Sequence, residues 1–520
     1  MPLVIILAAI ILPLSSASAA AVSSGTQVLF VAPNGSDGSN ACTVSSMPCA
    51  SIGHALAESG TGAIIEVAAG TYDEHGLIIS NSIELDGAGS ANTVIDAGHK
   101  GRAIQIQGSG SLTLEGVTIR NGKSHGHAGA IENSGTLALL NDRLIDNSAV
   151  DPGGAIVSYS TITELEDVRF VGNSTQSYGG AITNFGTIDN ATGETFTDNF
   201  AENGAGAIEN QGTISSLDDS SFRANRAGYA GAIDNSGEIA DLSKDTFWAN
   251  NVYGYGGALN NVFGTIGAVT DDTFVGNSVK DPYGQGGAIE QDNGTISSFA
   301  DDTITGNSAT IGGGIDNEES STFGAITGVI VALNTGTEGP NCNNFQGQLL
   351  DAGYNLESDA AASCGFSAAD HDLVGVDPDL RALGGYGGTN LTEPPFSDSP
   401  AINAGPHRVC ATSSDERGVP RPQGEHGACD IGAVEIALPT PTAITPSEGP
   451  DAGGTKVRVT GRGFTLTTKV RVGQTPVRFH VISDTAVEFT TPPGQGTESV
   501  TITDTDGRST RSLSFLYLSQ

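Results

Sequence analysis

The sequence predicts an all-β protein in which a parallel β-solenoid is followed by a small β-sandwich. Gly accounts for 72 of 520 residues, about twice the usual share, and Gly weakens helix interiors. The middle of the chain repeats with a period near 26 residues. Residues 1–438 carry a net charge of −38 and residues 439–520 one of +1, so the composition changes at the Pro-Thr run of residues 438–442. This change predicts a domain boundary.

The repeat has two elements that keep the same phase. The first is small-Gly-Ala-Ile, and its last residue recurs at spacings of 25, 26, 26, 25, 26, 30 and 26, at Ile131, Ile156, Ile182, Ile208, Ile233, Leu259, Ile289 and Ile315. The second is an aromatic residue followed three positions later by Asn, beginning at Phe170, Phe196, Phe222, Phe247 and Phe274. Leu144 and Ile304 begin variants of it. Seven cycles in phase exclude coincidence and indicate a repeat fold.

Each period contains short apolar–polar alternations separated by Gly and Asn, which is typical of short strands and turns. Such a repeat is one rung of a parallel β-solenoid, with rungs about 4.8 Å apart. We therefore expect Ile to stack on Ile in the core. We also expect a ladder of buried amides at Asn184, Asn210, Asn235, Asn261 and Asn317. The Gly pair would supply either a positive φ or a close approach at the corner.

The paired elements resemble those of chlamydial polymorphic outer-membrane proteins. That resemblance implies the right-handed parallel β-helix of the pectin-lyase-like class, which pectate lyases and many surface adhesins share. The segments 30–36, 48–50, 64–67 and 70–72 resemble the entry segment of such proteins. Residues Ala50 to Glu58 read as a short amphipathic helix that caps the first rung. We assign residues 27–337 to the cap and the rungs.

Residues 338–438 resemble the bacterial choice-of-anchor Q domain, through the segments 353–356, 377–380, 399–402, 415–418 and 429–435. That name denotes surface proteins whose anchoring tail varies. We expect this region to close the solenoid. Arg417 and Arg421 would pair with Asp430 and Glu435 in a structural cluster.

Residues 439–520 resemble the IPT/TIG family of immunoglobulin-like domains. The resemblance rests on the segments 446–450, 453–455, 461–464 and 515–517 and on Gly473. Strand-like alternation with Gly and Pro turns independently predicts a β-sandwich here. In secreted bacterial proteins this module is usually a spacer or a binding accessory.

Residues 1–19 read as a signal peptide, because an apolar run over residues 3–14 precedes the small residues Ala17-Ser18-Ala19. We expect a protein that is secreted or displayed on a bacterial cell surface, without a transmembrane segment in the mature chain. Six cysteines in an exported chain suggest disulfides. Fifteen connectivities are possible, and the close pairs predict local bridges: Cys42 with Cys49, Cys342 with Cys364, and Cys410 with Cys429.

The strong negative charge argues against nucleic acid as a partner. A polysaccharide or a cell-surface glycan is the partner that the fold and composition favour. No cofactor is expected, with the exception of calcium. The sequence does not indicate the oligomeric state, the ligand or the mode of anchoring.

An acidic row precedes the aromatic element by three residues, at Asp167, Asp219, Asp271 and Asp301, with Lys244 between them. If this row were exposed, its stacked carboxylates would attract cations, and calcium takes oxygen ligands flexibly. Asp219, Asp271 and Asp301 are therefore the candidate calcium ligands. Asp219, Lys244 and Asp271 are the candidate catalytic residues of a lyase, which needs metal-binding acids and a base. The alternative is a solvated face with one ion-paired lysine.

A second acidic row follows the repeated Ile, at Glu132, Glu209, Asp234, Glu290 and Asp316. Carboxylates on neighbouring rungs approach the ~5–5.5 Å separation of retaining glycosidases. Every such pair in a solenoid does so, however, and the pattern is weakly specific.

Tyrosines precede the Gly corner at Tyr178, Tyr229 and Tyr255, and Tyr283 lies in the longer turn of the next rung. A row of exposed tyrosines offers faces on which sugar rings stack, or else the tyrosines pack on one another. The sequence thus favours a non-catalytic protein of adhesion or glycan binding. The alternative is a secreted polysaccharide lyase or glycoside hydrolase.

Overall fold

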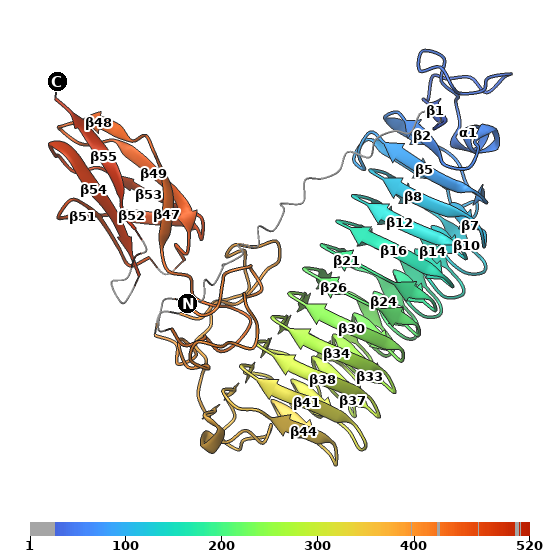
Figure 1. Cartoon of the computed structure of the whole chain (residues 1–520). Coiled ribbons are helices and arrows are strands. Elements are labelled where there is room, and N and C mark those ends of the chain that lie inside the picture. Colours follow the sequence, from blue (N-terminus) through green and yellow to red (C-terminus); the bar gives the residue numbers. More distant parts are fainter. Residues whose placement is uncertain are drawn as a thin grey trace, which may run out of the picture.

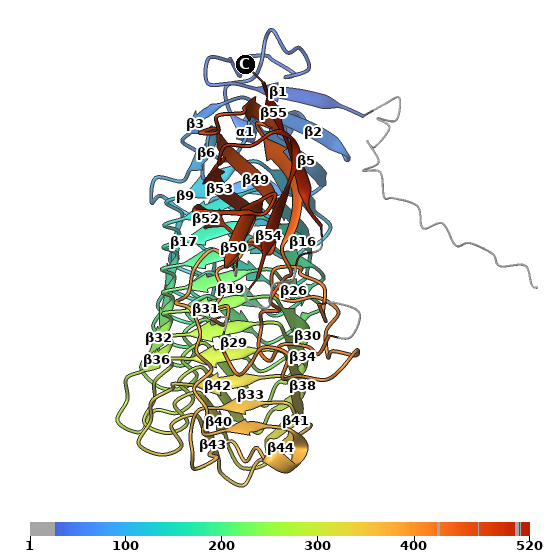
Figure 2. The ribbon, with the colours of Figure 1, turned by 90° about the vertical axis from the view of Figure 1, so that its left-hand side faces the viewer.

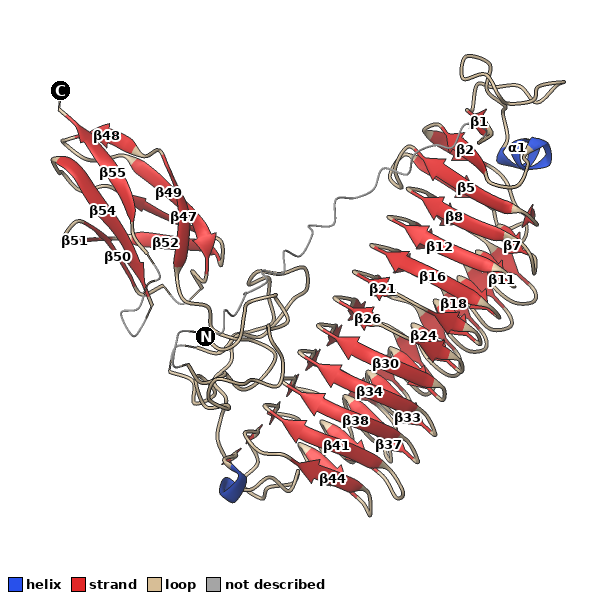
Figure 3. Ribbon diagram, viewed as in Figure 1, coloured by secondary structure: helices blue, strands red, loops and turns tan. Residues whose placement is uncertain are grey.

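The computed structural model describes residues 26–519 apart from 397, 424–426, 466, 505–508 and 510. The predicted signal peptide lies outside the described residues. The chain forms a parallel β-solenoid followed by a β-sandwich, as predicted (Figures 1 and 3). Its helical elements within the described residues are α1 (Ile52–Glu58) and the 3₁₀ turn η1 (Ala368–Asp370). Neither of them has the length and apolar character that crossing a membrane requires.

Four parallel sheets run along the solenoid and are named sheets A to D here. Sheet A has 15 strands: β1 (Val28–Val31), β2 (Ala63–Val67), β5 (Ser82–Gly87), β8 (Ser111–Glu115), β12 (Thr136–Leu140), β16 (Thr161–Glu166), β20 (Thr187–Ile188), β21 (Ala191–Thr192), β25 (Thr213–Ile214), β26 (Leu217–Asp218), β30 (Glu238–Ser243), β34 (Thr265–Thr270), β38 (Thr295–Ala300), β41 (Thr322–Thr327) and β44 (Gln348–Asp351). Sheet B has 13: β3 (Gly70–Tyr72), β6 (Thr93–Asp96), β9 (Thr118–Arg120), β13 (Arg143–Ile145), β17 (Arg169–Val171), β22 (Thr195–Thr197), β27 (Ser221–Arg223), β31 (Thr246–Trp248), β35 (Thr273–Val275), β39 (Thr303–Thr305), β42 (Ile330–Ala332), β45 (Leu356–Glu357) and β46 (Leu373–Val374).

The repeated Ile element forms sheet C. The residues before the Gly corner form a narrow sheet, sheet D. Sheet C has 11 strands: β4 (Leu77–Ile79), β7 (Ile104–Ile106), β11 (Ile131–Asn133), β15 (Ile156–Ser158), β19 (Ile182–Asn184), β24 (Ile208–Asn210), β29 (Ile233–Asn235), β33 (Leu259–Val262), β37 (Ile289–Asp292), β40 (Ile315–Asn317) and β43 (Cys342–Asn344). Sheet D has seven: β10 (Lys123–Ser124), β14 (Ser148–Ala149), β18 (Ser174–Thr175), β23 (Phe200–Ala201), β28 (Arg226–Ala227), β32 (Asn251–Val252) and β36 (Ser278–Val279).

The first rung is covered by α1, as the amphipathic pattern predicts. The hydroxyl of Ser51 caps the helix by accepting the His54 N–H, and the Glu74 carboxylate accepts the N–H groups of Ile52 and Gly53. Ile52 and Ala55 are buried against the solenoid core. The helix therefore closes the end of the core that no further rung covers.

Identical apolar side chains lie directly above one another in the core. Ile182, Ile208 and Ile233 are in register on neighbouring strands of sheet C. From Phe170 to Phe274, the five phenylalanines of sheet B stack with centroids 4.6–4.8 Å apart. The predicted repeat phase is thus confirmed.

Two ladders of buried amides connect the rungs. The predicted ladder in sheet C is confirmed from Asn184 to Asn261: the Asn184 side-chain amide donates to Asn210, Asn210 to Asn235, and Asn235 to Asn261. Beyond it, Asn261 donates to Gln291, which replaces Asn in the next rung, and Asn317 donates to Asn344. The Asn of the aromatic element forms a second ladder at the turn after sheet B, in which every amide also receives a backbone N–H. Each side-chain amide N–H₂ donates to an oxygen of a neighbouring rung. These buried side chains therefore have no unpaired donors.

The two glycines of the corner have different roles. The first, as in Gly256 and Gly286, has a positive φ of 56° and 63°. The second, as in Gly257, lies so close to the carbonyl oxygen of Gly287 on the next rung that a Cβ would collide with it. Both requirements expected from the sequence are therefore present, one at each position.

After its last rungs the chain turns back along the solenoid. We name residues 376–438 the return segment; it lies alongside sheet B (Figures 1 and 2). The three predicted disulfides, Cys42–Cys49, Cys342–Cys364 and Cys410–Cys429, are all present. They fasten the entry loop, the last rungs and the return segment.

The C-terminal sandwich packs a sheet of four strands on a sheet of five around its own apolar core. The first contains β47 (Thr440–Thr445), β49 (Lys456–Arg462), β53 (Ala486–Thr490) and β52 (Phe479–Ser483). The second contains β48 (Glu448–Pro450), β55 (Leu513–Leu518), β54 (Gly496–Thr503), β50 (Lys469–Val472) and β51 (Thr475–Val477).

Ile208→Asp tests the core register. Ile208 is buried between Ile182 and Ile233, so an unpaired carboxylate there should destabilise the solenoid by more than about 3 kcal/mol. The control is Ile208→Leu, since Leu259 occupies the same column two rungs on. Thermal unfolding gives the Tm of both variants. A Tm of the Asp variant equal to that of the wild type would contradict the register.

Candidate functional site

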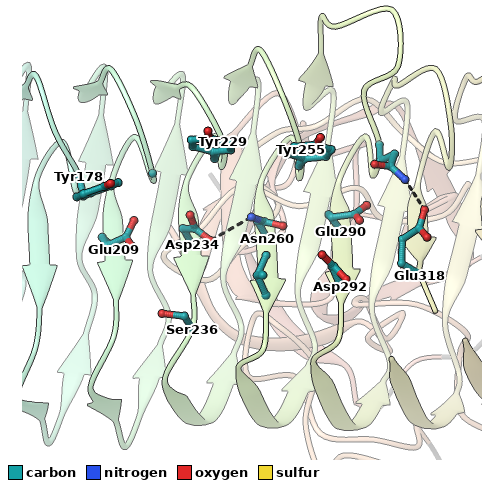
Figure 4. A pocket seen from close by; sticks show the side chains of 13 residues that line it. Tyr178, Glu209, Tyr229, Asp234, Ser236, Tyr255, Asn260, Glu290, Asp292 and Glu318 are labelled. Carbon is teal, nitrogen blue, oxygen red and sulfur yellow. Dashed lines mark hydrogen bonds between the residues drawn. The ribbon is translucent and has the colours of Figure 1, made fainter. Parts of the chain in front are cut away.

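A groove lies outside sheet C, where the turns before the Gly corner lie beside the strands (Figure 4). Its volume is about 690 Å³. Tyr178, Tyr229 and Tyr255 line one side, and acidic side chains of sheet C line the other. The groove extends over several rungs, so it suits a ligand that is itself long.

The tyrosines lie in one column because they occupy the same position in successive turns. The Tyr255 N–H donates to the Tyr229 carbonyl, and their rings are nearly parallel with centroids 6.4 Å apart. This separation exceeds that of the stacked core phenylalanines. Tyr178, Tyr229 and Tyr255 keep 41%, 46% and 40% of their surface exposed. Ring surface therefore remains free for a ligand.

Gly204 interrupts this column between Tyr178 and Tyr229. Its φ is 58°, and a Cβ there would collide with Glu209 Oε2 and the Tyr178 ring. The missing side chain thus leaves room for the Glu209 carboxylate. The sequence analysis did not identify this position, because Gly also recurs at every corner.

The acidic floor of the groove is one column of sheet C. Glu209 is in register with Asp234, Asp234 with Asn260, Asn260 with Glu290, and Glu290 with Asp316. Asn260 donates to Asp234 Oδ1 at 3.0 Å. The side chains point away from the core, as alternation predicts, but the overhanging turns bury most of them.

Burial makes these acids hold their protons unusually strongly. Burial, and then the negative charge of Glu209, raise the pKa of Asp234 well above its usual range, and burial raises the pKa of Glu209 itself. Burial and the Asp316 charge raise the pKa of Glu290 well above its usual range. Burial raises the pKa of Asp316 to about 6.

The far end of the groove contains groups that the sequence analysis missed. Gln285, and not Tyr283, pairs with Tyr255 in the column, and it donates to Glu318. Tyr283 is 81% exposed and lines a neighbouring depression of about 440 Å³ together with Tyr229, Tyr253 and Tyr255. The longer turn of its rung places Tyr283 beside the column of Tyr229 and Tyr255, and its part in binding stays a prediction.

The acidic row Asp219, Asp271 and Asp301 is not the exposed row that the sequence suggested. The return segment covers it: Asp271 and Asp301 are 3% and 1% exposed. The Thr412 hydroxyl lies 3.2 Å from Asp271 and 2.9 Å from Asp301, the Thr412 N–H donates to Asp301, and the Arg421 guanidinium lies 3.1 Å from Asp271. A cation of the chain itself thus occupies the place expected for calcium, and calcium binding remains a prediction without support from this geometry.

The candidate lyase residues are covered by the same segment. Thr389 and Asn390 donate to Asp219, and Asn390 also donates to the Lys244 carbonyl. The Lys244 ammonium pairs with Asp218 at 3.1 Å. Burial raises the pKa of Asp271 to about 8 despite Arg421. The three residues occupy neighbouring rungs, and none of them is among the residues that line the groove over sheet C.

The predicted cluster of the return segment is present with different pairing. Arg421 lies 3.6 Å from Glu435 and donates to the Asp430 carbonyl at 3.0 Å. Arg417 instead pairs with Asp415 at 2.7 Å and reaches only the backbone of Glu435. The cluster holds the return segment on the solenoid, which agrees with a structural role.

A third acidic column is wholly buried at the start of sheet B. The Asp272 carboxylate accepts the Asp245 N–H at 2.6 Å, and Asp302 accepts the Asp272 N–H at 2.8 Å. Burial, and then the neighbouring charges of the column, raise the pKa of Asp272 well above its usual range. Asn355 performs the same task in the same column, accepting the Val329 N–H at 3.0 Å.

Among the described residues, Cys42, Cys49 and His54 are the only three potential metal ligands whose ligand atoms lie together. The two sulfurs are joined in a disulfide, so this group is not a metal centre.

Comparisons with known proteins add information on fold. Residues 439–517 match the family model of the IPT/TIG domain. No curated protein matches the sequence. Among solved structures, the chain is similar to a rhamnogalacturonan lyase at 12% identity, over 72% of this chain and 96% of that chain, with a TM-score of 0.29.

The buried acids predict that stability falls as pH rises. A carboxyl with a raised pKa in the folded state stabilises the fold fully below its unfolded value of about 4, and this contribution is lost as pH rises through the folded value. Burial raises the pKa of Glu194 and of Glu416 to about 8. The Tm should therefore decrease from pH 4.5 to pH 8.5.

Asp272→Asn tests how much a charge in the buried column contributes to the pH dependence of stability. The amide can accept the same N–H as Asn355 does, without a charge, so the Tm at pH 8.5 should rise by roughly 2–4 °C with little change at pH 4.5. Glu238→Gln removes the same charge from an exposed position and should give no such difference. Equal behaviour of the two variants would contradict the explanation.

Proposed function

We propose that the protein binds polysaccharide chains in the groove over sheet C and does not modify them. The observation that carries the proposal is the row of part-exposed tyrosines above a polar floor, repeated at the rung spacing. Pyranose rings stack on aromatic faces, and their hydroxyls need acceptors such as carboxylates and amides. A β-linked sugar chain has nearly one ring per rung of such a solenoid.

The surroundings of the groove support a secreted or surface-displayed protein. Three disulfides suit an oxidising compartment, and an IPT/TIG domain beyond the solenoid suits a spacer or accessory binding module. We propose adhesion to glycan as the biological role. The choice-of-anchor Q resemblance of residues 338–438 is in keeping with this role.

The variant Tyr229→Ala/Tyr255→Ala tests the proposal. Loss of two stacking faces should weaken polysaccharide binding roughly tenfold. The Tm should change little, because both rings lie outside the Ile and Phe stacks. Tyr159→Ala is the matched control, since Tyr159 is equally exposed, stacks on Phe185 and is not among the residues that line the groove. Affinity electrophoresis against a glycan panel measures all three proteins.

An unchanged affinity of the double variant would reject the tyrosine platform. Unfolding of that variant would show that the tyrosines stabilise the turns, and single replacements at Tyr178 would then have to carry the test of binding.

Hydrolysis of the bound chain is the second candidate function, favoured by Glu209 and Asp234. They are in register on neighbouring rungs, about 4.8 Å apart by strand spacing, close to the ~5–5.5 Å of retaining glycosidases. Burial, and then the negative charge of Glu209, raise the pKa of Asp234 well above its usual range, which suits one acid and one nucleophile.

We expect no release of reducing ends from glycans that bind. Release that disappears in Asp234→Asn, with binding retained, would establish hydrolysis instead. Release of unsaturated uronates that disappears in Lys244→Ala would establish the lyase alternative.

A further inference from the structure

The ionisable side chains that line the groove are acidic, apart from the tyrosines. Its described lining contains five carboxylates, at Glu209, Asp234, Glu290, Asp292 and Glu318, and neither Lys, Arg nor His. The rest of the charge on the chain has the same sign, with a net charge of −37. The groove therefore repels polyanions such as uronate or sulfated chains and attracts polycations.

Two oxygen atoms of the groove lining have no hydrogen-bond donor. Glu209 is 5% exposed, and its Oε2 is buried without a partner within the described residues, as is Asn260 Oδ1. Farther along the floor, Glu290 and Asp316 instead share a hydrogen bond between their carboxyl groups. Buried acceptors without donors are costly. The chain thus provides neither a cation nor a donor for this oxygen of Glu209.

Elsewhere the chain matches such carboxylates with its own cations. Glu132 belongs to the same column as Glu209, and the Arg102 guanidinium contacts it at 2.5 Å. Asp271 in the covered row is matched by Arg421. The groove stands out because the equivalent positive group is not present among its lining residues.

We infer that the groove selects amino-sugar polymers, whose ammonium groups would lie on the Glu209–Asp234 and Glu290 carboxylates while their rings face the tyrosines. This inference rests on the proposed function and names its substrate class. An ammonium group provides three donors and a positive charge, which complement a lining with five carboxylates and no cation of its own. A lone metal ion fits less well, because no three acidic oxygens of the described groove lie together.

Binding of free-amine chains should also release protons. Burial keeps protons on the floor acids, and an ammonium placed beside them favours their ionised forms. Calorimetry in two buffers of different ionisation enthalpy would measure this release. A neutral chain should bind without it.

The test compares four oligomers of six units on the full protein at pH 6: β-1,4-linked glucosamine, its N-acetylated form, galacturonate and lysine. The glucosamine oligomer should bind about tenfold more tightly than the acetylated one, weaken with salt and release protons, whereas galacturonate should not bind. Oligolysine should bind more weakly than oligoglucosamine, because it lacks rings for the tyrosines.

Glu209→Gln/Asp234→Asn should remove the preference for the free amine and the proton release. Glu166→Gln/Glu238→Gln loses the same charge from exposed positions on sheet A and should keep both. The oligomer comparison on the wild type needs no variant, so a folding defect would leave the test intact.

The failures are distinguishable. Equal binding of the free and acetylated sugars would overturn the charge selection and leave glycan binding in place. Oligolysine binding as tightly as oligoglucosamine would overturn the sugar as the ligand. No binding of any sugar would overturn both this inference and the proposed function.

Discussion

In-register parallel stacking at one rung spacing is the constraint on which the rest of this structure depends. It places each side chain over its equivalent in the next rung, so that any residue type chosen for a column interacts mainly with itself. Phenylalanine, isoleucine and asparagine gain from this arrangement: rings stack at 4.6–4.8 Å and amides donate to amides. Aspartate and glutamate do not, because like charges then lie about one strand spacing apart.

The chain contains three solutions to that repulsion. In the buried column of Asp245, Asp272 and Asp302, backbone N–H groups bind one oxygen and burial keeps protons on the acids. In the covered row, the return segment brings Arg421 to Asp271. Over sheet C the acids line a groove, where a ligand could provide the positive charge. The three columns belong to the same repeat, and they differ in their place on the rung and in the groups that surround them.

The period of the repeat and the apolar–polar alternation were sufficient to predict which side chains stack in the core. The Ile column, the Phe stack and the amide ladder through Asn210 depend on neighbouring rungs, which the sequence reveals by spacing. The position of Arg421 was not predictable in this way. It lies 150 residues from Asp271 in sequence, in a segment without periodicity, and only its packing shows that an outward-pointing row is buried.

The candidate groove was predictable in part for the same reason. Tyr178, Tyr229 and Tyr255 follow the period and could be predicted, whereas Gln285 could not, because the longer turn of its rung hides which residue continues the column. The groove acids follow the period too, but neighbouring acids occur in any solenoid, and their spacing alone says little. Their burial beneath the turns distinguishes them, and that depends on Gly204 and on the overhang.

The residues that distinguish the groove from the rest of the solenoid surface are therefore departures from the repeat. Gly204 replaces a ring in the tyrosine column, and Asn260 replaces a carboxylate in the acidic one. The first opens space for Glu209, and the second provides Asp234 with a donor while separating it from Glu290. A perfectly regular repeat would present a uniform acidic ridge to every ligand. Because these two positions differ, the groove has a distinct pair of acids at one end, beneath a gap in the rings, and that end is where a bound chain can be recognised.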